Sequence, residues 1–392
     1  MKTTLLILMS AFCTSQIHAY PLPKQLTKSY DCKECSSLSH DKLQDQWSIT
    51  DQPLHDEVNN RQKSYSYREK VTAKQLKDGV VISTLAPGAV IRITPLQKKA
   101  MPRLMLKTPK EQLVPLKEAS ALFNQDEGTR EETLFMKHQT MLQIKPELGA
   151  GKFTLKSDDI DGKSSDTYLI NVFDKFSLTY LLVESDSLHY QYGDKLTATV
   201  SLKDSEEDYS VDDVNVSLVS PQGEITPLTL TKIKHNKFQG STFLNSEIND
   251  QGKNWYIDAN VNTTLDQKVI RRSGHAAFSY AIPSASLLSI KKLSATHLTF
   301  TATIDVATAS RYALQSVLFY QTGEGAAIRP IEISQKAQWF EPGKHVIQFT
   351  FDNSSQLSED NLYLGYLHLI DYGQLKTVYH YNKPIKVTQL LE

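Results

Sequence analysis

Short runs in which apolar and polar residues alternate recur along most of the chain. Residues 196–202 alternate leucine, alanine and valine with threonine and serine, and residues 214–218, 255–261 and 298–304 follow the same pattern. A period of two places the apolar side chains on one face, as in a β-strand that covers a core. Turn residues such as Pro87-Gly88 separate the runs. The pattern predicts an all-β protein made of tandem β-sandwich domains.

The runs group into three domains that follow a polar N-terminal stretch. We expect a β-rich domain at 64–174, an Ig-like β-sandwich at 175–283 and a C-terminal β-sandwich at 286–392. The middle region carries roughly seven short strands within about 100 residues, which is typical of the Ig-like architecture. It lacks the cysteine pair that joins the two sheets of antibody domains. A short linker is expected around Ile282-Pro283.

The C-terminal domain permits a prediction of strand register. In the run 346–351, Ile347, Phe349 and Phe351 share the more apolar face, which should therefore cover the core. The run 363–370 is apolar on both faces, so this strand is expected to be central and covered on both sides. One of its faces should carry Tyr363, Gly365, Leu367 and Leu369.

The first 19 residues have the layout of a secretory signal peptide. A short basic start precedes the apolar run Leu5–Phe12, and cleavage is expected after Ala19. The apolar run is shorter than the roughly 20 residues that a membrane-spanning helix needs. Lipidation is not expected, because Phe12 stands directly before Cys13 where lipoprotein signals carry a small residue. We therefore expect an exported protein, periplasmic or secreted, with a polar and flexible extension at 20–63.

Composition narrows the classes of partner. Hydrophobic residues make up 40% and charged residues 22% of the chain, which is ordinary for a folded protein. The 43 basic and 44 acidic residues nearly balance. A nucleic-acid partner is not expected, because such proteins carry a clustered basic excess. No later apolar run is long enough to span a bilayer, so we expect no membrane anchor.

After removal of the signal peptide, Cys32 and Cys35 are the remaining cysteines. Two cysteines in an oxidising compartment predict a disulfide bond. A zinc site remains an alternative, but it would need two more ligands, for which Asp31, His40 and Asp41 are near in sequence. A redox-active pair would require a βαβ context that this stretch does not predict.

Other chemistry-bearing residues do not form a recognisable motif. Residues 158–162 resemble part of a calcium loop, but Ser157 and Tyr168 occupy the positions where that loop needs acidic ligands. Acidic residues at 204–208 and 212–213 predict a solvated loop, and a calcium site at the edge of the Ig-like domain is an alternative. His275 lies in a strand-like run and is interpreted as structural. We assign no catalytic residue, metal or cofactor.

Three stretches, 84–96, 148–151 and 271–278, resemble a family of exported bacterial proteins. That family is known as a domain of unknown function with tandem Ig-like parts. The resemblance covers most of the mature chain and implies a β-sandwich fold without assigning site residues. The last two domains also resemble the accessory β-sandwiches that follow secreted bacterial peptidases.

The sequence favours an exported, non-catalytic binding or interaction protein with an unknown protein or glycan partner. Two alternatives stay open: a secreted hydrolase whose site is assembled from distant residues, and an accessory factor for another exported protein. Aromatic residues are dense in the C-terminal domain and could form an exposed platform or part of its core. They are Trp339, Tyr363, Tyr366, Tyr372, Tyr379 and Tyr381.

Thiol titration tests the expected pairing of Cys32 with Cys35. The exported protein, denatured without reductant, should show essentially no free thiol, because both sulfurs are joined. Two titratable thiols, or zinc bound in a one-to-one ratio, would contradict the pairing.

Overall fold

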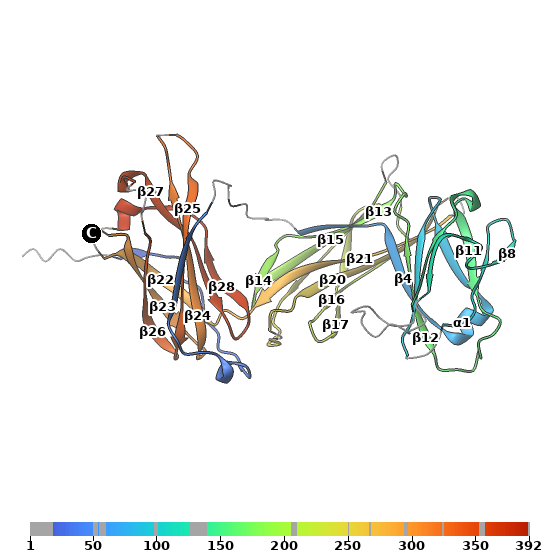
Figure 1. Ribbon diagram of the computed structural model, residues 1–392, viewed down its shortest axis with the longest axis horizontal. Helices are drawn as coiled ribbons and strands as arrows, with labels where there is room; N and C mark the ends of the chain where they lie inside the picture. Colours follow the sequence, from blue (N-terminus) through green and yellow to red (C-terminus); the bar gives the residue numbers. More distant parts are fainter. Residues whose placement is uncertain are drawn as a thin grey trace, which may run out of the picture. The chain divides into compact units, whose positions relative to one another are not determined.

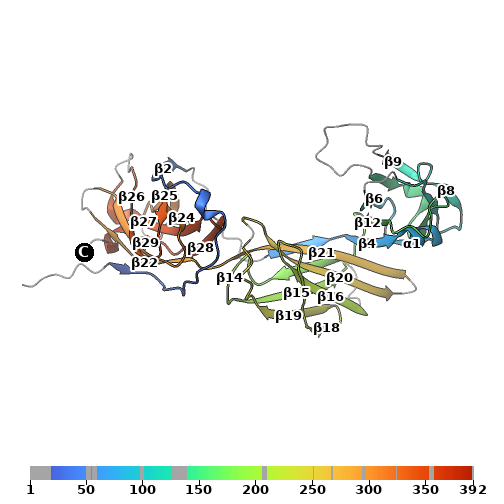
Figure 2. The same cartoon turned by 90° about the horizontal axis from the view of Figure 1, so that it is seen from below.

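The computed structural model describes residues 19–49, 54, 60–97, 101–125, 139–204, 210–249, 251–265, 268–293, 297–323, 325–352 and 357–390. The chain divides into two units, residues 57–280 and residues 1–56 with 281–392. Both units are built from antiparallel sheets (Figure 1, Figure 2), which confirms the all-β prediction. In this described part, no helix is long and apolar enough to cross a membrane.

The first sandwich of the unit 57–280 encloses an apolar core between two sheets. One sheet has the order β4-β12-β6-β10-β9, with strands Ser66–Thr72, Thr167–Phe173, Val90–Pro95, Thr140–Ile144 and Ser120–Gln125. The other has the order β5-β11-β7-β8, with strands Val80–Thr84, Gly151–Lys156, Met105–Lys107 and Leu113–Pro115. Ile82, Ile93 and Phe153 are fully buried between the sheets. The helix α1 (Ala73–Asp78) starts at a capping box of Thr72 and Gln75, which satisfies two backbone N–H groups.

The second sandwich follows the predicted alternation closely. One sheet has the order β18-β19-β15-β13-β3, with strands Leu230–Lys234, Lys237–Phe243, Lys195–Lys203, Tyr180–Ser185 and Asn60–Ser64. The other has the order β14-β21-β20-β16-β17, with strands His189–Gln191, Lys268–Ala281, Trp255–Leu265, Asp213–Val219 and Ile225–Pro227. The predicted inward residues Leu196, Ala198, Val200 and Leu202 are all buried. Burial of these side chains supplies much of the driving force for this domain.

The unit of residues 1–56 and 281–392 contains the C-terminal sandwich. One sheet has the order β1-β22-β23-β26, with strands Tyr20–Pro21, Ala285–Lys292, Thr299–Val306 and Gly343–Thr350. The other has the order β2-β25-β24-β27-β28, with strands Leu43–Ser48, Arg329–Phe340, Ser310–Tyr320, Leu362–Asp371 and Lys376–Tyr381, and β29 (Ile385–Lys386) pairs with β27. Ile347, Phe349 and Phe351 are buried, so the predicted register of β26 is confirmed.

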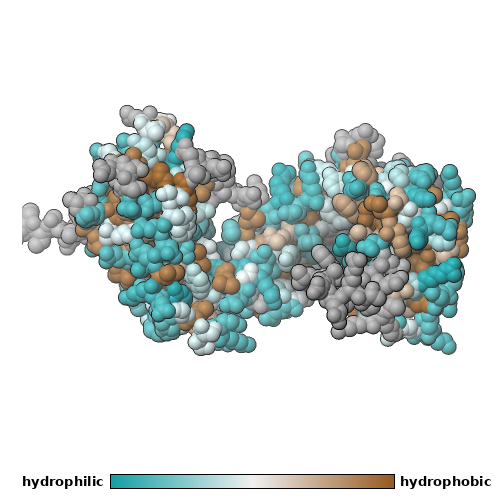
Figure 3. All heavy atoms as spheres, in the orientation of Figure 1, coloured by the Kyte–Doolittle hydropathy of each residue, from teal (hydrophilic) through white to brown (hydrophobic). Residues whose placement is uncertain are grey.

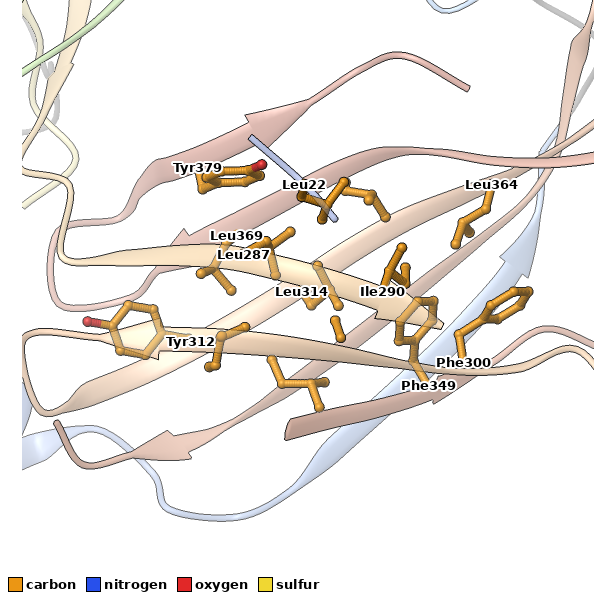
Figure 4. Close-up of a cluster of buried hydrophobic side chains, with 14 of the residues drawn as sticks. Leu22, Leu287, Ile290, Phe300, Tyr312, Leu314, Phe349, Leu364, Leu369 and Tyr379 are labelled. Atoms are coloured by element: carbon orange, nitrogen blue, oxygen red, sulfur yellow. The ribbon is translucent and has the colours of Figure 1, made fainter. Parts of the chain in front are cut away.

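The expectation of a flexible extension at 20–63 is wrong for the described residues. Strands β1 and β2 complete the edges of the two C-terminal sheets, and β3 pairs with β13 of the second sandwich. Leu22 reaches into the C-terminal core, where Figure 4 draws it beside Tyr379. The segment has polar composition because edge strands expose most of their side chains: in β2 only Gln44 is even half-buried.

The expected faces of β27 also need correction. This strand is central, between β24 and β28, but Leu364, Leu367 and Leu369 all lie in the core. Alternation breaks at Tyr366, whose φ of 53° lies in the left-handed region, and the pairing with β24 shifts register at the same place. A β-bulge inserts an extra residue and so moves the following side chains to the other face.

A buried ion pair joins the two sandwiches of the unit 57–280. Asp174 follows the last strand of the first sandwich, and Arg272 lies in β21 of the second; each side chain is 1% exposed. The Arg272 guanidinium donates to Asp174 (3.0 Å), to the Ser177 hydroxyl (2.9 Å) and to the Thr179 carbonyl (3.1 Å). Asp174 also accepts the backbone N–H groups of Leu85 and Ala86. Burial lowers the pKa of Arg272, and the neighbouring carboxylate of Asp174 opposes that shift.

Replacing Phe349 by alanine tests the C-terminal core. The ring is 1% exposed and stacks on Phe300 at 5.6 Å between centroids. Its removal should lower the free energy of unfolding by about 3–5 kcal/mol, measured by urea denaturation. Val346→Ala is the matched control, since Val346 is 58% exposed on the opposite face of the same strand and should cost less than about 0.5 kcal/mol. A loss below about 1 kcal/mol at Phe349 would contradict the register of β26.

Candidate functional site

The outer face of the sheet β14-β21-β20-β16-β17 is polar over three adjacent strands. Strand register aligns its side chains in rows: Arg271, Asn262 and Asp213; Ser273, Asn260 and Asn215; His275, Asp258 and Ser217. Tyr256 continues the β20 row on the same face and is 38% exposed. We call these ten residues the polar face. Period-two alternation produces it, because the intervening residues of all three strands point into the core.

Strand β4 of the first sandwich runs against one edge of the polar face. Arg68 donates to Asp258 at 2.7 Å and its backbone N–H donates to the Ser273 hydroxyl at 3.1 Å. Arg271 donates to Glu69 at 2.9 Å. Gly274 lets β3 approach β21, since an added Cβ there would lie 3.2 Å from the Ser64 side chain.

Two hollows lie along this contact. The first, of about 250 Å³, is lined on one side by Lys63 and Arg68 and on the other by Asp258 and His275. The second, of about 300 Å³, is lined by Glu69 and Arg271 together with the asparagines of the polar face, Asn215, Asn260 and Asn262. Tyr67, Arg68 and Ser273 line both hollows, so the two adjoin each other, and we call them together the groove.

The charges of the groove largely compensate one another. Arg68 and Asp258 form one ion pair, and Arg271 and Glu69 form another. Burial raises the pKa of Tyr67 to about 12, so its hydroxyl stays neutral and accepts the Ser83 N–H. The groove therefore presents paired charges and neutral amides, and no strong field of one sign.

The asparagine amides of the groove and the exposed ring of Tyr256, which lies on the same sheet face outside the two hollows, define what the polar face can bind. An asparagine side chain carries two donors and two acceptor sites in a fixed plane; the Asn215 amide already donates to the Asp213 carboxylate. Tyr256 supplies an apolar ring with a polar end, and His275 meets this ring edge-on at 5.7 Å between centroids. This combination suits a neutral ligand that is rich in hydroxyl groups and has apolar faces.

The structure brings Cys32 and Cys35 together. Their sulfurs lie 2.00 Å apart and their Cα atoms 5.4 Å apart. Both sulfurs lie against Gly373. A Cβ atom added to this glycine would come within 2.7 Å of either sulfur. His40, one of the three residues suggested as further zinc ligands, stacks on Trp339 at 4.2 Å between ring centroids. In the ranges that the structure describes, no three His, Cys, Asp or Glu residues gather as a metal site. Oxidation of the pair stays a prediction.

Several acidic side chains of the two predicted loops accept hydrogen bonds from other groups of the protein. Asp159 accepts the Ser157 hydroxyl and the Arg103 N–H, and Asp161 accepts the Lys163 N–H. Asp204 accepts the Thr179 hydroxyl, and Asp212 accepts the hydroxyl of Thr263 and the N–H of Thr264. Residues 205–209 of the predicted second loop lie outside the described residues.

The aromatic residues of the C-terminal domain make contacts within that domain. Tyr379 is 3% exposed and donates to the Pro23 carbonyl, and Trp339 donates to Glu341 beside the predicted turn. Tyr363 donates to Gln321, and Arg311 lies over the Tyr372 ring. These contacts favour a packing role over an exposed platform.

Sequence reasoning missed most of the groove. From the sequence, His275 is interpreted as structural, Arg271 is included only within the stretch 271–278 that carries the family resemblance, and Arg68, Asn260 and Asn262 are not singled out. One pattern in the sequence does indicate the polar face. The outward positions of 255–261 carry a tyrosine, an aspartate and an asparagine, whereas the outward positions of 196–202 carry only threonine and serine. The contact between β4 and the polar face leaves no local pattern in the sequence.

Sequence models of three domains match the chain. They are the N-terminal, central and C-terminal domains of DUF4785, each described as a domain of unknown function, at residues 34–174, 177–281 and 284–388. Among curated proteins, no match was found.

One solved structure is similar over its whole length. It is a DUF4785 family protein of Legionella pneumophila subsp. pneumophila str. Philadelphia 1, with 60% identity and a TM-score of 0.83 over 94% of this chain and 100% of that chain. Salmonella alpha-2-macroglobulin matches at 13% identity and a TM-score of 0.29, over 84% of this chain and 21% of that chain. The adhesin domain of Epf from Streptococcus pyogenes matches at 11% identity and a TM-score of 0.16, over 58% of this chain and 81% of that chain. The last two scores are too low to indicate a shared overall fold.

The Arg68→Gln variant tests whether the groove contributes to stability. The ion pair with Asp258 is exposed, at 47% for the arginine side chain, so water screens it. The free energy of unfolding should change by less than about 1 kcal/mol in urea denaturation. A loss above about 2 kcal/mol would show that the pair holds the fold and is not available for binding.

Proposed function

The chain belongs to the DUF4785 family, and we propose that it acts as an exported, non-catalytic binding protein whose ligand is a neutral glycan held on the polar face. The observation that carries this proposal is the group of three planar amides in the second hollow, Asn215, Asn260 and Asn262, on the same sheet face as the exposed ring of Tyr256. Vicinal sugar hydroxyls can each donate and accept, so planar amides match them in pairs. An aromatic ring covers the apolar face of a sugar.

A glycan suits this surface better than a folded protein does. The centre of a protein–protein interface is apolar and depleted of charge, with a polar rim. The polar face has the reverse arrangement, with asparagine and serine at its centre, in the row of Ser273, Asn260 and Asn215. On the side of the molecule drawn in Figure 3, hydrophobic residues lie in small groups between hydrophilic ones.

The charge of the groove also selects among polymers. A polyanion would require an excess of unpaired lysine and arginine. Here Arg68 and Arg271 are each paired with a carboxylate. This supports a neutral ligand and argues against nucleic acid and against strongly acidic polysaccharides.

A glycosidase acting on the same ligand would need two cooperating carboxyl groups. Glycosidases place them about 5–10 Å apart. Asp213 and Asp258, the two carboxylates that the sheet itself supplies, lie on neighbouring strands four positions apart in register, or about 14 Å between backbones from strand rise and spacing. Glu69, the other carboxylate of the second hollow, accepts from Arg271, so these carboxylates favour binding over glycoside cleavage.

Export is supported by the position of the first strand. Tyr20, the residue that follows the predicted cleavage site, is the first residue of β1 and pairs with Ile290. A signal peptidase cut after Ala19 would therefore leave the whole of β1 in the mature chain. The proposed location is the periplasm or the medium outside the cell.

A glycan array followed by titration calorimetry tests the function. The mature chain, residues 20–392, should bind neutral oligosaccharides, and Asn260→Ala should weaken the best of them by about tenfold, since it removes at least one ligand hydrogen bond. The matched control is Asn124→Ala, an exposed asparagine on β9 of the other sandwich, which should leave the affinity unchanged. An array without any neutral glycan bound, or equal affinities of the Asn260 and Asn124 variants, would contradict the proposal.

A further inference from the structure

A third hollow lies in the first sandwich of the unit 57–280, apart from the polar face. Its volume is about 430 Å³, within the usual range of small-molecule pockets. Its walls come from both sheets: Leu104, Pro115 and Leu116 from the region of β7 and β8, and Phe123 and Thr140 from β9 and β10. The hollow therefore opens between the sheets at one margin of the sandwich.

Six of the ten residues that line the hollow are apolar. Leu104 and Leu116 are buried at 6% and 4% exposure, and Met101 and Phe123 pack against the same core cluster. Pro102 and Pro115 complete the apolar lining. Such a wall gains free energy by covering a hydrocarbon chain.

Two positively charged side chains also line this hollow. Arg103 and Lys117 both line the hollow and are exposed. Among the residues that the structure describes, neither side chain takes part in an ion pair. Asp159 also lines the hollow, but its two oxygens accept the Ser157 hydroxyl and the Arg103 backbone N–H. The cationic groups are therefore available to an anionic ligand.

One polar side chain of the wall is buried without a hydrogen-bond partner. Thr140 lines the hollow and is 1% exposed, and its Oγ1 has no hydrogen-bond partner in the described part of the chain. A buried hydroxyl without a partner costs free energy, and a hydrocarbon tail on this wall would leave that cost unchanged.

We propose that this hollow binds a medium-chain carboxylate, with its hydrocarbon tail on the apolar wall and its carboxylate at Arg103 and Lys117. Charge-assisted hydrogen bonds from an arginine fork and an ammonium group suit a carboxylate. The volume accommodates about 14 non-hydrogen atoms if each takes roughly the 30 Å³ that a water molecule occupies in the liquid. Decanoate fits that size. The proposal does not depend on glycan binding by the polar face.

Titration calorimetry of the full mature chain with decanoate tests the site. Wild type should bind one decanoate per chain, with a Kd of roughly 1–100 μM for a ligand of this size. Arg103→Gln and Lys117→Gln should each weaken binding by about tenfold, and both side chains are exposed, so the fold should persist. Lys152→Gln, at an exposed lysine of β11 outside the hollow, is the matched control and should bind as wild type does.

Binding of decanol separates the contribution of the ligand's carboxylate charge from that of its hydrocarbon tail. Decanol should bind at least about tenfold more weakly than decanoate to wild type, and equally weakly to the Arg103→Gln variant. Absence of decanoate binding to wild type, or equal binding of decanoate by wild type and by the double variant of Arg103 and Lys117, would overturn the proposal. Failure here leaves the glycan experiment unaffected, because that experiment uses a different face and different variants.

Discussion

The ion pair between Asp174 and Arg272 is the constraint on which the unit 57–280 depends. Two charges removed from water are costly unless every lone pair and N–H group finds a partner. Here the guanidinium reaches Asp174, Ser177 and two carbonyls, and the carboxylate accepts two backbone N–H groups from the first sandwich. The same two side chains therefore fix the end of one sandwich to a strand of the other.

The groove follows from that connection. Arg272 points inward from β21, so its neighbours Arg271 and Ser273 point outward and meet Glu69 and the backbone of Arg68. The two ion pairs of the groove are partly exposed to water, so they should contribute little to stability. Binding chemistry can therefore vary at the groove while the buried pair and the cores keep the two walls in place.

Much of the fold could be predicted because it is local. The alternation of apolar and polar residues predicted which side chains of 196–202 point inward, and it predicted the burial of Ile347, Phe349 and Phe351. Edge strands β1 and β2 escaped prediction because their side chains stay in water and leave no apolar signal. The bulge at Tyr366 depends on a single left-handed residue. The groove could not be predicted from the sequence, because Arg68 and Asp258 are 190 positions apart and only the tertiary structure brings them together.

A double-mutant cycle on the buried pair tests the central claim most directly. The free energy of unfolding of the unit 57–280 within the mature chain would be measured for wild type, Asp174→Asn, Arg272→Met and the double variant. Each single change should cost about 3–5 kcal/mol, because it leaves a buried charge without its partner. The double variant should cost about 2–3 kcal/mol less than their sum. Single costs below about 1 kcal/mol, or additivity within about 0.5 kcal/mol, would contradict the account.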